Sequence, residues 1–302
     1  MSHSHVHAPS GVVDLSPAFR WAVAFNSGYV VIELIAGLAT GSLALLADAA
    51  HNLTDVAGLL IAWGAAVLAA RPPSSRFTYG FGRATILAAL ANAIAILIGV
   101  GAVIWEAVQR FSQPVEVPGV TILVVALIGI AINAGTALLF RASRHSDMNA
   151  QGAFLHMAAD AAVSLAVVIA AAGILLTGWN WLDPAVAILV SLLIAWAAFG
   201  LLRGSVGLSF DGVPMTIDQD NITAWLKDRP GVTSIHDLHI WSLSTTATAL
   251  TVHLVMPKGP PGDSFLEQIT DELSRNFSIA HATIQIETGN SDQCRLAPDN
   301  VI

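Results

Sequence analysis

The chain has 302 residues, of which 55% are hydrophobic and only 11% are charged, with a formal net charge of −8 and a mean hydropathy of +0.67. Soluble domains carry about 25% charged residues, so this composition excludes an ordinary soluble domain and favours a protein with several membrane spans. The single cysteine, Cys294, excludes an internal disulfide framework and a thiolate-rich metal site, and nothing in the charge balance indicates nucleic-acid binding.

Residues 1–17 form a polar N-terminal tail that contains the histidine-rich stretch HSHVH at residues 3–7. This composition is compatible with a zinc-catching tract, an expression-tag remnant or a plain mobile tail. The tail lacks the basic residues and apolar core of a cleavable signal peptide, so we expect it to stay in the cytoplasm.

Residues 18–204 are predicted to form a transmembrane domain of six helices. Each apolar segment is long enough to cross a hydrocarbon core of about 30 Å at about 1.5 Å per residue. The segments must be helical because lipid cannot satisfy backbone polar groups. Loops rich in helix breakers separate them, such as RPPSSR at 71–76 and GWNWLDP at 178–184. The expected spans are 18–40, 43–69, 84–109, 118–140, 150–176 and 184–202.

The distribution of basic residues predicts the orientation of these spans. Arginines gather in the loops on one side, whereas the opposite side has Arg110 and little else. Because basic loops stay in the cytoplasm, six spans then place both termini there, in a multi-pass protein of the inner or plasma membrane. The arginines on the cytoplasmic side are Arg71, Arg76, Arg83, Arg141, Arg144 and Arg203.

Residues 205–302 are predicted to form a small cytoplasmic α+β domain. The alternation of apolar residues changes from the helical period to the strand period and back along this region. The resulting order is α-β-β-α-β, which is typical of a two-layer domain. The expected elements are 222–229, 234–243, 247–257, 263–277 and 281–288.

Two His-x-x-x-Asp patterns lie inside apolar spans, HNLTD at 51–55 and HMAAD at 156–160. Residues four apart share a helix face, so each histidine points the same way as its aspartate. If the faces of spans two and five meet, the four side chains form a tetrahedral N2O2 site, for which Zn²⁺ is the best candidate. A packing role is the alternative, but ionisable groups in a span cost about 2.5–3.5 kcal/mol each, which favours function. The predicted ligands are His51, Asp55, His156 and Asp160.

Two further acidic residues stand near this site. Asp48 lies one turn before His51, and we expect it to support the site or pack between helices before acting as a ligand. Glu33 in the first span is a candidate for the lining of a water-filled cavity that leads to the site.

Four motifs together resemble the zinc-transporting branch of the cation diffusion facilitator family, which includes bacterial cobalt-zinc-cadmium exporters and zinc transporters. They are GSLALLADAAHNLTDV, FTYGFGRATILAAL, LHMAADAAVS and HDLHIWSL, and the similarity covers nearly the whole chain. The resemblance implies six spans, a metallochaperone-like cytoplasmic domain and a homodimer. It further implies divalent metal/H⁺ antiport by alternating access, with the two histidines and two aspartates above as transport ligands.

The resemblance also implies a regulatory zinc site in the cytoplasmic domain. The residues carried over are His236, His253, His281 and Glu287, and a packing role for the histidines is the alternative. Cys294 is assigned no more than a weak zinc contact.

A charge interlock between Arg83 and Asp211 is a further implication of the resemblance, against the alternative of two ordinary interfacial charges. One departure from the family pattern is Thr85, where relatives often carry an acidic residue.

The predicted function is export of cytoplasmic Zn²⁺ in exchange for protons, and the protein is not expected to be an enzyme. Exporters whose main substrate is cadmium, cobalt or nickel are the closest alternative, because these ions accept the same ligands. An intramembrane zinc hydrolase would need an open metal position and a general base, but position 52 is Asn where an HExxH motif has Glu. A metal sensor would leave the buried ligands of the spans unexplained.

Overall fold

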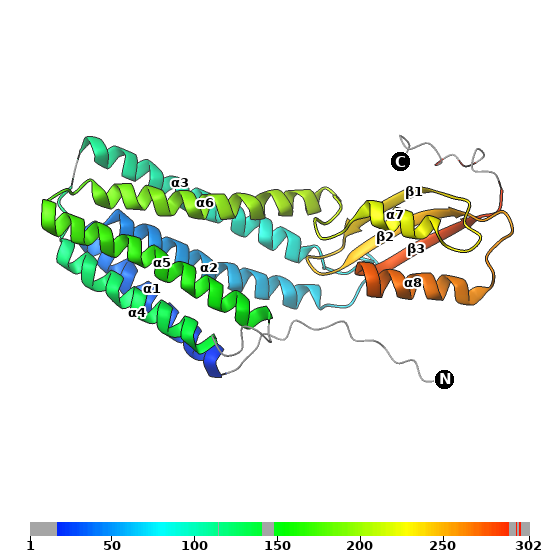
Figure 1. Ribbon diagram of the computed structural model, residues 1–302, viewed down its shortest axis with the longest axis horizontal. Coiled ribbons are helices and arrows are strands. Elements are labelled where there is room, and N and C mark those ends of the chain that lie inside the picture. Colours follow the sequence, from blue (N-terminus) through cyan, green and yellow to red (C-terminus); the bar gives the residue numbers. More distant parts are fainter. Residues whose placement is uncertain (1–16, 114, 141–147, 290–293, 295, 297–302) are drawn as a thin grey trace. The chain divides into compact units, whose positions relative to one another are not determined.

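The computed structural model describes residues 17–113, 115–140, 148–289, 294 and 296, with six long helices followed by a small α+β domain (Figure 1). Gly41 joins the first two helices with a positive φ of 68°, and Gly178 follows the fifth with a φ of 70°. The helices are α1 (Pro17–Thr40), α2 (Leu43–Ala69), α3 (Ala84–Ser112), α4 (Gly119–Phe140), α5 (Met148–Thr177) and α6 (Leu182–Ser209).

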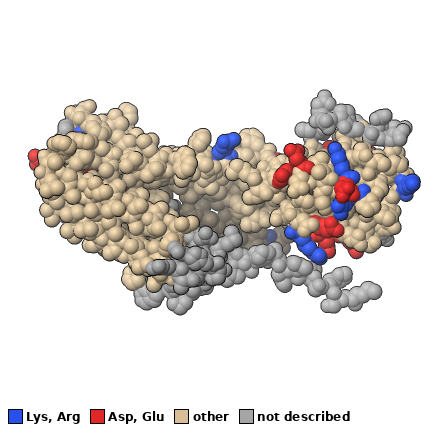
Figure 2. All heavy atoms as spheres, viewed as in Figure 1, with Lys and Arg blue, Asp and Glu red and all other residues tan. Residues whose placement is uncertain are grey.

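Among the described residues, helices α2 to α6 are each long and apolar enough to cross a membrane. Helix α1 adds a shorter apolar stretch, Ala24–Thr40. Figure 2 shows the consequence on one face, where the helices are nearly free of charged side chains while acidic and basic residues gather on the C-terminal domain. The predicted six-helix membrane domain is confirmed.

The chain divides into two compact units, and each is described by itself. The first comprises the described parts of Met1–Val56 and Ile96–Trp196, in which α4 packs against α1 and α5. One apolar cluster there joins α1, α2, α4 and α5 around Tyr29, Leu45, Ile122 and Val167. A second cluster joins α2, α3 and α6 around Leu43, Ala47, Val100, Val190 and Ile194.

The second unit, Ala57–Ala95 with Ala197–Ile302, contains the C-terminal α+β domain. Its sheet has the order β1-β2-β3, with β1 and β2 antiparallel and β2 and β3 parallel. The predicted α-β-β-α-β order is therefore confirmed. The helix predicted at 263–277 has these bounds, and the boundaries of the other elements differ by at most three residues. The elements are α7 (Gln219–Lys227), β1 (Ser234–Ser242), β2 (Thr248–Val255), α8 (Asp263–Phe277) and β3 (Ile279–Glu287).

Both helices of this domain cover the same face of the sheet. Leu226 of α7 and Leu273 of α8 are fully buried in one cluster with Leu250, Val252 and Leu254 of β2. Since strand side chains alternate between faces, His253 points to the opposite face, away from the helices.

Candidate metal sites

The two intramembrane His-x-x-x-Asp motifs meet in the structure through Asp160 of α5. One carboxylate oxygen, Oδ1, lies 3.5 Å from Nε2 of His51 on α2. The other, Oδ2, lies 3.6 Å from Nε2 of His156, one turn earlier on α5. Asp160 is only 2% exposed, although it carries an ionisable carboxyl in an apolar helix. The arrangement brings together three of the four predicted transport ligands.

The fourth predicted ligand, Asp55, lies in α2 one turn after His51, and its side chain is outside the described part of the structure. Its position on the helix places it on the same face as His51. The rings of His51 and His156 lie edge to face with centroids 6.2 Å apart, so the two imidazoles are direct neighbours.

A small cavity of about 20 Å³, roughly the room that one water molecule needs, also borders His51. Small residues of α2 and α3, including Ala47, Ala50 and Gly99, line it together with Ser191 of α6. The Ser191 hydroxyl is buried and has no hydrogen-bond partner among the described residues. His51 therefore lies close to Asp160 and also lines this cavity.

The acidic residues near the site are buried more deeply than the histidines. Asp48 is 1% exposed, and its Oδ2 accepts a hydrogen bond of 3.3 Å from the Ser164 hydroxyl of α5. Glu33 is 0% exposed and accepts hydrogen bonds from Tyr29 and Asn52. Neither carboxyl lines the cavity beside His51.

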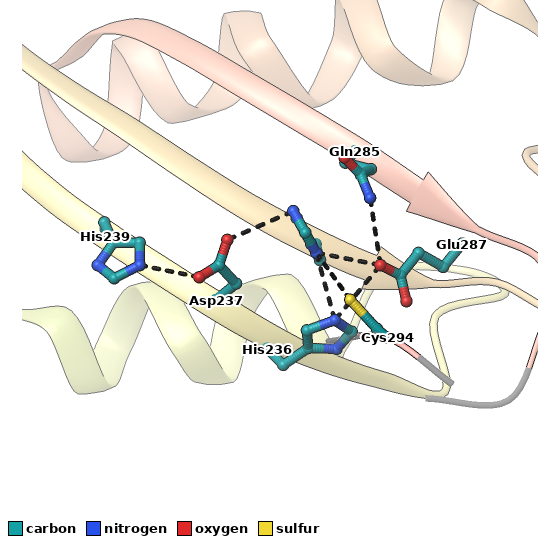
Figure 3. A network of polar contacts seen from close by, with 7 residues as sticks. His236, Asp237, His239, Gln285, Glu287 and Cys294 are labelled. Atoms are coloured by element: carbon teal, nitrogen blue, oxygen red, sulfur yellow. Dashed lines mark hydrogen bonds and ion pairs between the residues drawn. The ribbon is translucent and has the colours of Figure 1, made fainter. Parts of the chain in front are cut away.

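A second group of metal-ligating side chains lies on the helix-free face of the C-terminal sheet. His236 of β1 is opposite His253 of β2 in the strand register, and Glu287 ends β3 (Figure 3). Cys294, seven residues further on, completes the group, and one ligand atom from each residue lies within 4.8 Å of all the others. Among the described residues, no other group of three or more histidine, cysteine, aspartate or glutamate side chains meets that limit.

The distances in this cytoplasmic cluster, His236, His253, Glu287 and Cys294, match a zinc site. Nδ1 of His253 lies 3.3 Å from Nε2 of His236, 3.0 Å from Oε1 of Glu287 and 3.8 Å from Sγ of Cys294. Zinc bonds of about 2.0–2.3 Å in a tetrahedron separate ligand atoms by about 3.3–3.6 Å. The residues thus fit Zn²⁺ with only small adjustments.

His281 is the one predicted cytoplasmic ligand that the structure does not bring to this cluster. It lies near the start of β3, six residues before Glu287, and its ring stacks edge-on against Tyr79 at 5.6 Å. Six residues of strand span about 20 Å, which is too far for both side chains to bind one ion. Cys294, which the sequence reasoning rated weakly, lies at the cluster in its place.

Asp237 is a supporting residue that the sequence reasoning missed. The pairing of β1 shifts between His236 and His239, and Asp237 adopts a positive φ of 51° at this bulge. Its carboxylate lies 3.4 Å from Nε2 of His253 and 2.9 Å from Nε2 of His239. A proton held on Nε2 of His253 leaves Nδ1 free to bind a metal ion, as carboxylate–histidine pairs do at zinc sites.

Electrostatic interactions within the cluster shift two of its pKa values in opposite directions. Burial disfavours the Glu287 carboxylate, but a hydrogen bond from Cys294 and the charges of His236 and His253 outweigh burial and lower the pKa of Glu287. A backbone hydrogen bond at Leu296 favours the Cys294 thiolate, yet the hydrogen bond to Glu287, burial and nearby acidic charges together raise the pKa of Cys294. The thiol must therefore lose a proton when it binds a metal ion.

Arg83 and Asp211 are in contact in the second unit, just before α3 and just after α6. Their side chains are 50% and 55% exposed, so the pair is more accessible to water than a buried junction would be. Next to it, the Thr85 hydroxyl accepts a hydrogen bond of 3.0 Å from the Thr245 backbone. The start of α3 is thus attached to the C-terminal domain. The HSHVH stretch lies outside the described residues.

Comparisons with known proteins agree with this architecture. The sequence model of the cation efflux transmembrane domain matches residues 20–208, and that of the cation efflux cytoplasmic domain matches residues 214–289. The zinc transporter ZitB of Escherichia coli is 37% identical over 291 residues, which cover 95% of this chain and 93% of the relative.

Other relatives have broader metal names. The cation efflux protein CzcD of Cupriavidus metallidurans is 35% identical over 98% of this chain and 92% of its own length. A cadmium, cobalt and zinc/H⁺-K⁺ antiporter of Bacillus velezensis is 35% identical over 95% of this chain and 92% of its own length. With its apolar helices, the chain is a multi-pass membrane protein, and it belongs to the zinc-transporting branch of the cation efflux, or cation diffusion facilitator, family.

Proposed function

We propose that this protein exports Zn²⁺ from the cytoplasm in exchange for protons, by alternating access of a site made of His51, Asp55, His156 and Asp160. The observation that carries the proposal is the convergence of both histidines on the buried Asp160 carboxylate between two membrane helices. Two imidazoles and two carboxylates are ligands suited to a borderline divalent cation.

Proton exchange follows from the ligand chemistry. A histidine binds a metal ion only when its nitrogen is deprotonated, and an unperturbed imidazole titrates near neutral pH. Protons that arrive from outside therefore expel the ion, and their loss to the cytoplasm allows the next ion to bind.

The same proposal places both termini in the cytoplasm. The basic loops support this orientation. The Thr85–Thr245 hydrogen bond supports it as well, because the α2–α3 loop and the C-terminal domain must then lie on the same side of the membrane. We further propose that the C-terminal domains pair in a homodimer. Zinc in the cytoplasmic cluster would then regulate transport without being carried.

The test uses purified protein in vesicles with an acidic interior and a zinc-sensitive dye. Outward proton flow should drive zinc uptake, and collapse of the pH gradient should stop it. Asp160→Ala should reduce uptake to the level of empty vesicles, because it removes the carboxylate that both histidines approach. Glu106→Gln is the matched control, since Glu106 is a half-exposed carboxyl that pairs with Arg110. Normal zinc uptake by Asp160→Ala would refute the site.

Cadmium or cobalt as the main substrate is a second candidate, which the names of the CzcD and Bacillus relatives favour. Competition among Zn²⁺, Cd²⁺, Co²⁺ and Mn²⁺ in the same vesicles ranks the ions directly. Uptake that Cd²⁺ or Co²⁺ supports better than Zn²⁺ would decide for this candidate.

A further inference from the structure

Asn52, one turn after Asp48 on α2, donates a hydrogen bond to Glu33 of α1, which brings the carboxyl groups of Glu33 and Asp48 into one polar network. Both are almost completely shielded from solvent, at 0% and 1% exposure. Two buried carboxylates in one network repel each other strongly unless the pair holds a proton. In the described part of the chain, no lysine or arginine pairs with either group to offset that repulsion.

The remaining contacts of the pair leave one place for this proton. Both oxygens of Glu33 accept hydrogen bonds, Oε1 from the Tyr29 hydroxyl at 2.9 Å and Oε2 from Nδ2 of Asn52 at 3.4 Å. Oδ2 of Asp48 accepts from Ser164, whereas its Oδ1 is buried and receives no N–H or O–H from a described residue. A carboxyl proton shared within the pair would supply the missing donor.

The pair is electrostatically linked to the zinc site without being part of it. On the side of α2 and α5, Asp48 interacts with the charges of His51 and Asp160. From α1, the titratable neighbour is Tyr29. Helix α4 presents Gly129, where an added Cβ would stand 2.2 Å from the Tyr29 hydroxyl, so no titratable group enters from that side.

We propose that Glu33, paired with Asp48, carries one of the protons that this protein exchanges for zinc, an inference that rests on the zinc/proton exchange proposed above. When the zinc site is empty, the pair holds one proton and a single negative charge. Arrival of Zn²⁺ beside His51 and Asp160 adds two positive charges, which favour the doubly negative pair. The carboxyl O–H bond then breaks, and the proton leaves to water. Departure of zinc reverses the step, so zinc and this proton compete without sharing a ligand atom.

The first test counts protons released when zinc binds to the purified full-length protein in weakly buffered solution. Glu33→Gln keeps the size of the side chain and one acceptor oxygen, and should release about one proton fewer per protein than wild type. The double variant with Asp48→Asn should also lose about one proton and not two, because the two carboxyls share it. An unchanged count in Glu33→Gln, or a loss of two protons in the double variant, overturns the proposal.

Two control variants separate titration from packing. Tyr29→Phe removes the hydrogen bond to Glu33 but keeps both carboxyls, so it should release the wild-type number of protons. Glu106→Gln removes a carboxyl elsewhere and should do the same. A loss in Tyr29→Phe equal to that in Glu33→Gln would mean that damaged packing, not the missing proton, lowers the count.

A measurement on the unmodified protein keeps the idea testable if a variant fails to fold. Zinc binding should remove the infrared C=O band of a protonated carboxylic acid, and a zinc-induced difference spectrum without that loss overturns the proposal. Vesicles provide the separate check on the proposed function. Zinc uptake without proton counterflow in wild type refutes the antiport, whereas normal counterflow with an unchanged proton count in Glu33→Gln refutes only the role of the carboxyl pair.

Discussion

Replacement of Asp183 is expected to destabilise the protein, because this residue ties the first turn of α6 to the first turn of α2. Its Oδ1 accepts hydrogen bonds from the Ser42 hydroxyl at 2.5 Å and the Ala44 amide at 3.3 Å, and its Oδ2 accepts from the Leu43 amide at 2.7 Å. The three donor residues are at most 3% exposed. Water therefore cannot take the place of the carboxylate.

The size of the effect follows from these contacts. In Asp183→Ala the Ser42 hydroxyl can rotate toward another acceptor, but the amides of Leu43 and Ala44 cannot. Each buried donor without a partner costs about 1–3 kcal/mol, so the free energy of unfolding should fall by about 2–6 kcal/mol. Asp183→Asn keeps one acceptor oxygen and should lose about half as much.

Unfolding of the detergent-solubilised protein by heat and by denaturant measures this loss. Glu106→Gln, at a half-exposed ion pair, is the control and should change the free energy by no more than about 0.5 kcal/mol. If Asp183→Ala is as stable as this control, the carboxylate does not hold the start of α2 in the way described.

Three further outcomes are expected. Replacing both His236 and His253 with Ala should raise the zinc concentration for half-maximal transport in vesicles yet leave transport at saturating zinc; complete inactivity of a folded double variant would contradict a regulatory role. Arg83→Asp should impair transport and Asp211→Arg should restore part of the loss, although the exposed pair limits the effect on stability to about 1 kcal/mol; strictly additive effects would show that the residues do not interact. The raised pKa of Cys294 keeps its thiol protonated near neutral pH, so this thiol must release a proton when zinc binds. The zinc affinity of the cytoplasmic cluster should therefore fall as pH falls, by up to about tenfold per pH unit for this proton. Cys294→Ser should flatten that pH dependence in a competition titration.

The sequence alone predicted those features that depend on local spacing. Apolar runs of membrane length require helices wherever they lie in the chain, because lipid offers backbone groups no hydrogen bonds. The four-residue spacing of His51 and Asp55, and of His156 and Asp160, places each pair on one helix face by the geometry of a single turn. The order of elements in the C-terminal domain likewise follows from alternation within each segment.

The tertiary structure decided which distant residues meet. His281 and Cys294 were both available as cytoplasmic ligands, and the folded structure brings Cys294, not His281, to Glu287. The bulge that turns Asp237 toward His253 has no signature in the local sequence. The buried network of Glu33 and Asp48 joins two helices through packing around Tyr29. Such contacts follow from how whole helices and strands pack against one another, and no spacing along a single helix or strand contains that information.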